Sequence, residues 1–134
     1  MLKRKVYQEL LKWKENTEGK ALCIIGARQI GKTTLIREFG KNEYEHFAEI
    51  NFVTDEKAAD IFNDKLTAEA IITNLTAYLQ TPLEPGKTLI LFDEVQECPA
   101  VRSAIKFLVE DGRFDYIESG SLLGVRYKEV RSYP

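Results

Sequence analysis

Histidine and cysteine are scarce in this chain of 134 residues, which holds one histidine and two cysteines. The single His46 leaves almost nothing from which to build a histidine metal cluster or a serine–histidine triad. Cys23 lies in an apolar run and Cys98 follows an acidic segment. These contexts favour two reduced bystanders over a disulfide or a metal-binding pair. The composition therefore argues against the common metal-centre and triad-hydrolase classes.

Long apolar runs and a strong net charge are missing as well. No stretch of 18 apolar residues occurs, and the opening Met1-Leu2-Lys3-Arg4-Lys5 does not lead into the apolar core of a signal peptide. We therefore expect a cytoplasmic protein with no membrane partner. The net charge of −2 gives no global footprint for nucleic acid. Basic clusters at residues 3–5 and among Arg126, Lys128 and Arg131 are interpreted as solvated surface.

The composition suits one globular domain over residues 1–134, since the chain is 44% apolar and 30% charged and has no internal repeat. Apolar spacing predicts a lead-in helix within residues 1–18. Further strands are expected near 21–25, 47–53, 89–92 and 114–119, with helical segments near 34–39, 58–62, 67–80 and 99–111. Gly40 is expected to end the second helix. Strands that alternate with helices imply an α/β fold with a parallel sheet.

The most informative segment reads Gly26-Ala27-Arg28-Gln29-Ile30-Gly31-Lys32-Thr33. It is a complete Gly-x-x-x-x-Gly-Lys-Thr phosphate-binding loop between a predicted strand and a predicted helix. The glycines let the main chain approach a phosphate, and successive N–H groups form an anion nest at a helix N-terminus. We expect Lys32 to reach the β- and γ-phosphates of a nucleotide and Thr33 to offer its hydroxyl to Mg²⁺.

Two adjacent carboxylates, Asp93 and Glu94, follow the apolar strand at 89–92. Acids at the end of a buried strand are costly unless a cation meets them, and Mg²⁺ bound to nucleotide phosphates is the obvious partner. We expect Asp93 to hold this ion through water and Glu94 to orient and deprotonate the attacking water. Ser119 and Ser121 also fall beyond the carboxyl ends of the strands, where ligands of parallel sheets bind. One of the two serines is expected to sense the γ-phosphate.

Residues 26–35, 91–99 and 118–125 together resemble the AAA-type P-loop ATPase domain of a large family of prokaryotic ATPases. The resemblance covers essentially the whole chain and implies a three-layer αβα sandwich with an additional-strand P-loop core. It implies metal support by Asp93 and catalysis by Glu94. Nucleotide contacts are implied for Gly26, Ala27, Arg28, Gln29, Ile30, Gly31, Lys32, Thr33 and Thr34.

Members of that family usually continue further, with a fifth core strand and a C-terminal domain. The resemblance therefore implies that this chain is truncated and lacks the fifth strand. Residues 21–25 would then form an exposed or partner-covered edge that invites self-association. An arginine finger would come from the missing region or a neighbouring subunit, with Arg126 and Arg131 as weaker candidates and Arg113 less well placed.

The leading functional hypothesis is Mg²⁺-dependent ATP hydrolysis that drives motion in the remainder of a longer chain or in a protein client. The alternative is a nucleotide-binding regulatory or interaction fragment with little or no turnover. A GTPase is disfavoured because no Asn-Lys-x-Asp segment for guanine recognition occurs. A small-molecule kinase is disfavoured because Glu94 beside Asp93 suits water activation better than phosphate transfer to a substrate.

Overall fold

The computed structural model describes residues 2–17, 20–25, 31–120 and 129–133. The first elements are helix α1 (Leu2–Glu15), strand β1 (Ala21–Ile25), helix α2 (Lys32–Glu43) and strand β2 (His46–Asn51). The middle of the chain forms the 3-10 helix η1 (Glu56–Phe62), helix α3 (Ala68–Leu79), strand β3 (Thr88–Asp93) and the 3-10 helix η2 (Val95–Glu97). Helix α4 (Ala100–Asp111), strand β4 (Asp115–Gly120) and strand β5 (Glu129–Tyr133) follow.

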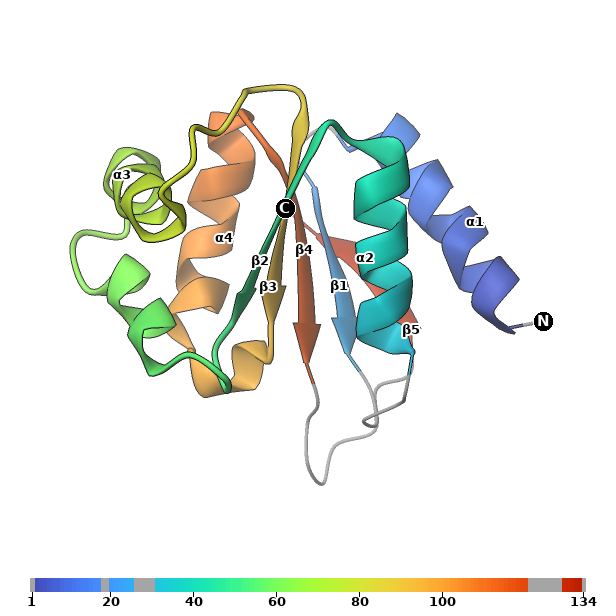
Figure 1. Cartoon of the computed structure of the whole chain (residues 1–134), viewed down its shortest axis with the longest axis horizontal. Coiled ribbons are helices and arrows are strands. Elements are labelled where there is room, and N and C mark those ends of the chain that lie inside the picture. The colour runs from blue at the N-terminus through green and yellow to red at the C-terminus, as the bar shows by residue number, and fades with distance from the viewer. Residues whose placement is uncertain (1, 18–19, 26–30, 121–128, 134) are drawn as a thin grey trace.

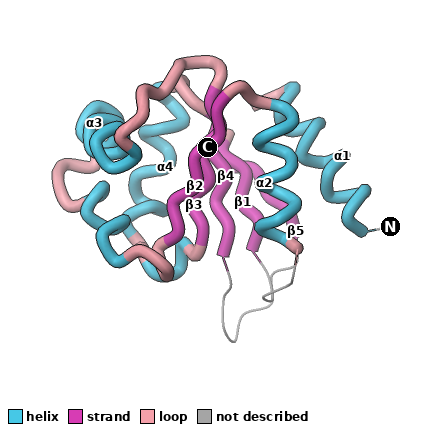
Figure 2. Tube along the Cα trace, viewed as in Figure 1, coloured by secondary structure: helices cyan, strands magenta, loops and turns pink. Residues whose placement is uncertain are grey.

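A five-stranded sheet in the order β2-β3-β4-β1-β5 forms the middle layer. Strands β2, β3, β4 and β1 are parallel to one another. Helices α1 and α2 cover one face of the sheet and α3 and α4 cover the other, as Figures 1 and 2 show. This three-layer arrangement confirms the predicted α/β class and its parallel, P-loop-like sheet.

The two faces of the sheet carry separate apolar clusters because side chains alternate across a strand. On one face, strand residues pack with helices α1 and α2: Leu10, Trp13, Leu22, Ile24, Ile36, Phe39, Leu89, Leu91 and Ile117. On the other face, Ile90, Phe92 and Tyr116 pack with residues of η1, α3 and α4. This alternation decides the face on which each polar residue at a strand end lies.

Strand β5 corrects the expectation about the edge of the sheet. It pairs antiparallel with β1, with Tyr133 opposite Ala21 and Glu129 opposite Ile25. Since β4 lies on the other side of β1, the prediction that residues 21–25 form an edge is wrong. Strand pairing needs only backbone N–H and C=O groups, so a short segment without an apolar pattern can supply it. With strands on both sides, β1 offers no free edge for self-association.

Helix α2 also extends past the glycine that was expected to end it. It continues to Glu43, and the N–H of Tyr44 donates to the carbonyl of Gly40 at 3.2 Å. Gly40 is buried, and a Cβ at this position would lie only 2.2 Å from Cδ1 of Phe47 on β2. The glycine therefore permits close packing of the helix on the sheet instead of a turn.

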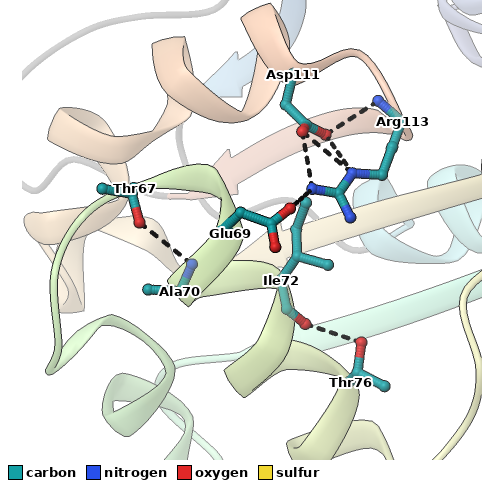
Figure 3. Close-up of polar contacts among 7 residues, drawn as sticks. All are labelled: Thr67, Glu69, Ala70, Ile72, Thr76, Asp111 and Arg113. Atoms are coloured by element: carbon teal, nitrogen blue, oxygen red, sulfur yellow. Dashed lines mark hydrogen bonds and ion pairs between the residues drawn. The ribbon is translucent and has the colours of Figure 1, made fainter.

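Arg113 ties helix α3 to helix α4 in the turn that precedes β4, at the end of the sheet opposite the strand carboxyl ends. Figure 3 shows its guanidinium between two carboxylates. Its Nε lies 2.9 Å from Oδ2 of Asp111, and its Nη2 also donates to Glu69 of α3. The nearby Thr67 caps α3 by accepting from the N–H of Ala70 at 3.2 Å. These contacts give Arg113 a structural role.

None of the helices in the described part of the chain combines the length and the apolar character needed to cross a membrane. Cys23 and Cys98, which both belong to the described residues, are buried and are not joined by a disulfide.

Candidate functional site

The carboxyl ends of β1, β3 and β4 lie near the N-terminus of α2 at one end of the sheet (Figure 1). Residues 26–30 of the predicted phosphate-binding loop lie outside the described residues, as does Ser121. Gly31, which directly precedes α2, has φ 102° and ψ −15° and accepts the N–H of Leu35 at 2.8 Å. This left-handed backbone favours glycine, so the backbone conformation explains why the second glycine of the motif is a glycine.

Thr33 and Asp93 are in contact at this end of the sheet although they are 60 positions apart in the chain. The hydroxyl Oγ1 of Thr33 donates to Oδ2 of Asp93 at 3.3 Å. Asp93 is the last residue of β3 and is only 4% exposed, and its Oδ1 accepts the N–H of Glu94 at 2.9 Å. The structure thus brings together the two residues that the sequence predicts as metal-binding partners.

Burial raises the pKa of Asp93, and the charge of Glu94 acts in the same direction. The N–H of Glu94, the charge of Lys32 and the Thr33 hydroxyl act against that rise. Because the pKa of Asp93 is raised in the folded chain, protonated Asp93 favours the folded state at low pH. This contribution to the free energy of unfolding is lost as the pH rises from the ordinary pKa of an aspartate through the raised one, and the ionised carboxylate is then buried at a cost. A cation beside the ionised carboxylate would offset this cost, and its binding should weaken as the pH falls through the same window.

Lys32 reaches across to the end of β4. Its Nζ donates to the carbonyl oxygen of Gly120, the last residue of that strand, at 3.0 Å. The ammonium group therefore lies at the carboxyl ends of the strands, where the sequence predicts the phosphates of a ligand. A hydrogen bond to a neutral carbonyl is weaker than one to an anionic oxygen, so phosphate could displace this contact.

Ser119 stands beside Asp93 across the sheet. In the register of the strands it pairs with Asp93 on β3 and with Ile24 on β1. It follows Ile117 by two residues, and Ile117 packs toward α2, so the Ser119 side chain is on the same face as Asp93. Ser119 is fully buried, and its Oγ has no hydrogen-bond partner among the described residues. An unpaired buried hydroxyl costs about 1–3 kcal/mol, so a ligand oxygen would be a favourable partner.

Glu94 adopts an uncommon backbone conformation directly after β3. It has φ 58° and ψ 47°, the left-handed region that a residue with a Cβ seldom occupies. Its side chain is half-buried, and Oε1 accepts a hydrogen bond from Nε2 of Gln96 at 2.8 Å. Strained conformations of this kind cluster at functional sites. Glu94 lies next to Asp93 with a defined carboxylate position.

Asn51 is a site residue that the sequence interpretation missed. Its Oδ1 accepts the N–H groups of Val53 at 2.8 Å and Thr54 at 3.0 Å, while its Nδ2 lies 3.5 Å from Oδ2 of Asp93. The side chain thus links the loop after β2 to the buried carboxylate. The rule that pointed to Asp93, a polar residue at the carboxyl end of a parallel strand, would also have pointed to Asn51.

The candidate arginine fingers are only partly placed. Arg126 lies outside the described residues, and Arg131 belongs to β5, where it pairs with Cys23 in the strand register. Arg113 bonds to Asp111 and Glu69 at the opposite end of the sheet. Arg113 is therefore remote from the carboxyl-end site, whereas a role for Arg126 or Arg131 stays a prediction.

Comparison with protein families identifies the domain to which most of the chain is similar. A family model described as an AAA domain matches residues 18–134. The matched segment contains every predicted site residue, from Gly26 to Ser121, and starts after helix α1. No curated protein matches the chain.

Proposed function

We propose a function from the premise that this chain belongs to the AAA domain family, whose model matches residues 18–134. Membership indicates nucleotide binding. The specific proposal is that the chain binds ATP with Mg²⁺ and hydrolyses it. The observation that carries the proposal is the contact between Thr33 and Asp93 at the carboxyl end of the sheet. Lys32 and Glu94 are their neighbours in the chain and lie at the same end.

The phosphates of ATP would lie at the N-terminus of α2, against residues 26–34. The first N–H groups of a helix have no partner within the helix and favour an anion there. Lys32 would exchange its contact with the Gly120 carbonyl for the β- and γ-phosphate oxygens, which are stronger acceptors. The main chain and one lysine thus bind the triphosphate.

The donor set at Asp93 fits a magnesium ion. A carboxylate and a hydroxyl are hard oxygen ligands, and Mg²⁺ in nucleotide sites commonly combines such groups with phosphate oxygens and water. Thr33 would offer its hydroxyl directly, and Asp93 would hold the ion through water. When bound, the ion would neutralise phosphate charge that develops during transfer.

Glu94 would act as the general base. Its carboxylate would accept a proton from the water that attacks the γ-phosphorus, and the proton would remain on a carboxylate oxygen until phosphate leaves. The alternative, a nucleotide-binding regulatory module, predicts that ATP binds with normal affinity and is not turned over. Phosphate release by the wild-type chain in Mg²⁺ and in EDTA, together with ATP titration, separates the two functions.

We expect Asp93→Asn to remove the Mg²⁺ dependence of ATP binding. The amide cannot supply the negative charge that draws the ion, so the dissociation constant of ATP should rise by about tenfold in Mg²⁺, a change of roughly 1.4 kcal/mol, and stay unchanged in EDTA. The melting temperature without nucleotide should not fall much, because the variant no longer buries a costly charge. Nucleotide fluorescence titration and thermal melting measure both quantities. A variant that still binds ATP more tightly in Mg²⁺ would contradict the role of Asp93.

Ser119 is proposed as the γ-phosphate sensor, because its buried hydroxyl lacks a hydrogen-bond partner among the described residues and shares a face with Asp93. We expect Ser119→Ala to slow turnover by about tenfold or more, as loss of one donor to a developing charge does. The melting temperature without nucleotide should stay the same or rise, since an unpaired polar group leaves the core. Ser121→Ala is the matched variant. Full turnover in Ser119→Ala with slow turnover in Ser121→Ala would transfer the sensor role to Ser121.

A further inference from the structure

Gln96 connects three segments of the candidate site. It lies in η2, two residues after Glu94, and is half-buried. Its Nε2 donates to Oε1 of Glu94 at 2.8 Å, a distance typical of a good hydrogen bond to a carboxylate. The same side chain lies against Gly120 at the end of β4, which in turn accepts a hydrogen bond from Lys32.

The backbone of Glu94 is already fixed by its neighbours. Its N–H donates to Oδ1 of Asp93 at 2.9 Å, and its carbonyl accepts the N–H of Glu97 at 3.1 Å. These bonds hold the left-handed conformation that starts η2. The carboxylate of Glu94, however, is separated from that backbone by three rotatable bonds. A side-chain contact can fix its direction, and the hydrogen bond from Gln96 is such a contact.

Gly120 leaves the space in which the Gln96 amide lies. A Cβ at position 120 would come within 2.5 Å of Oε1 of Gln96, and within 3.3 Å of the backbone nitrogen and Cγ2 of Val95. The first distance is too short for any real contact, whereas the other two need only small adjustments. A side chain at position 120 would therefore displace the end of Gln96 before it disturbed the strand or η2.

We propose that Gln96 is a positioning residue that sets the direction of the Glu94 carboxylate, with Gly120 as the surface against which its amide rests. The inference depends on the proposed function, in which Glu94 is the general base. A general base must point at the water whose proton it accepts in the reactive complex, and small misplacements of reacting groups are costly in rate. Gln96 acts on the reaction through Glu94 and needs no contact with ATP.

The first test replaces the amide by a side chain of similar length without a donor. In Gln96→Met we expect single-turnover hydrolysis of ATP to slow by about tenfold, while the dissociation constant of ATP stays within about twofold. Gln96→Asn keeps the amide on a shorter side chain, and its rate of hydrolysis should lie between those of the wild type and Gln96→Met. A residue that only supports the fold would instead lower the melting temperature and weaken ATP binding together.

A double-mutant cycle with Glu94→Gln separates an action through Glu94 from an independent one. If Gln96 acts through Glu94, Gln96→Met should slow hydrolysis little further in the Glu94→Gln background. Equal slowing in both backgrounds overturns the inference, and so does an unchanged rate in Gln96→Met when Glu94→Gln is slow. In those two cases the ATPase proposal stands. Full turnover in Glu94→Gln would instead refute the general base, and the role of Gln96 with it.

Gly120→Ala offers a second, steric test. It should slow single turnover to the level of Gln96→Met, and it should have no added effect when combined with Gln96→Ala, which removes the side chain that the new methyl displaces. A measurement without turnover completes the test. The side-chain amide signals of Gln96 in the NMR spectrum of the wild-type chain should shift in Glu94→Ala, and an unchanged signal would overturn the contact itself.

Discussion

Lys32→Ala should abolish ATP binding by this chain. The variant leaves the β- and γ-phosphate charge without its one mobile cation in the anion nest, a loss of roughly 2–4 kcal/mol by analogy with a broken buried charge pair. The dissociation constant should therefore rise by about two orders of magnitude. Titration with a fluorescent ATP analogue in Mg²⁺ measures the change.

The fold should tolerate this substitution, which makes the result interpretable. Lys32 is half-exposed, and its ammonium group donates a hydrogen bond to the Gly120 carbonyl. Lys41→Ala is the matched control, since Lys41 is an exposed lysine in the last turn of the same helix. The control should bind ATP as the wild type does. Undiminished ATP affinity in Lys32→Ala would refute the assignment of the phosphate-binding loop.

The sequence predicted the helices and the four parallel strands well because their signals are local. Apolar runs such as residues 89–92, and stripes at helical spacing, depend only on neighbours in the chain. The strand β3 and the helices α3 and α4 lie where these patterns placed them. Positions that depend on distant packing were harder. Gly40 resembled the end of a helix, yet it lies inside α2. A glycine is needed there because the Phe47 ring occupies the space that a side chain would fill.

The edge of the sheet could not be predicted for a related reason. Strand β5 has neither an apolar run nor a strict alternation, and its identity as a strand rests on backbone pairing with β1. Such pairing depends on where the chain returns in space, which residue types in a short segment do not encode. The antiparallel neighbour of β1 is consequently a feature that only the structure reveals.

The candidate site divides along the same line. Lys32, Thr33, Asp93 and Glu94 belong to motifs whose chemistry can be interpreted from residue type and spacing. The choice of Ser119 over Ser121 as the proposed sensor needed the strand register, which puts Ser119 beside Asp93. Gln96 had no signal of its own, because a glutamine after an acidic pair has many uses. Its contact with Glu94 follows from the turn of η2 and the missing side chain of Gly120.

Glu94→Gln should keep ATP affinity and cut hydrolysis by about two orders of magnitude or more, the usual contribution of a general base. The amide preserves the size of the carboxyl group and can still accept a hydrogen bond from Gln96, so the nucleotide site should stay intact. It cannot accept the proton of the attacking water at neutral pH. Single-turnover phosphate release and ATP titration on the same preparation measure the two effects.

Glu97→Gln is the matched control for this variant, because it removes the same charge from an exposed residue of η2, the 3-10 helix that directly follows Glu94. It should hydrolyse ATP at the wild-type rate. If Glu94→Gln and Glu97→Gln slowed hydrolysis equally, the effect would come from net charge near the phosphates and not from proton transfer. If neither slowed an active wild-type chain, the base would have to be another group. Slow hydrolysis in Glu94→Gln alone, with ATP affinity retained, is the pattern that general-base catalysis requires, since the base acts on the attacking water in the transition state and contributes little to the binding of ATP.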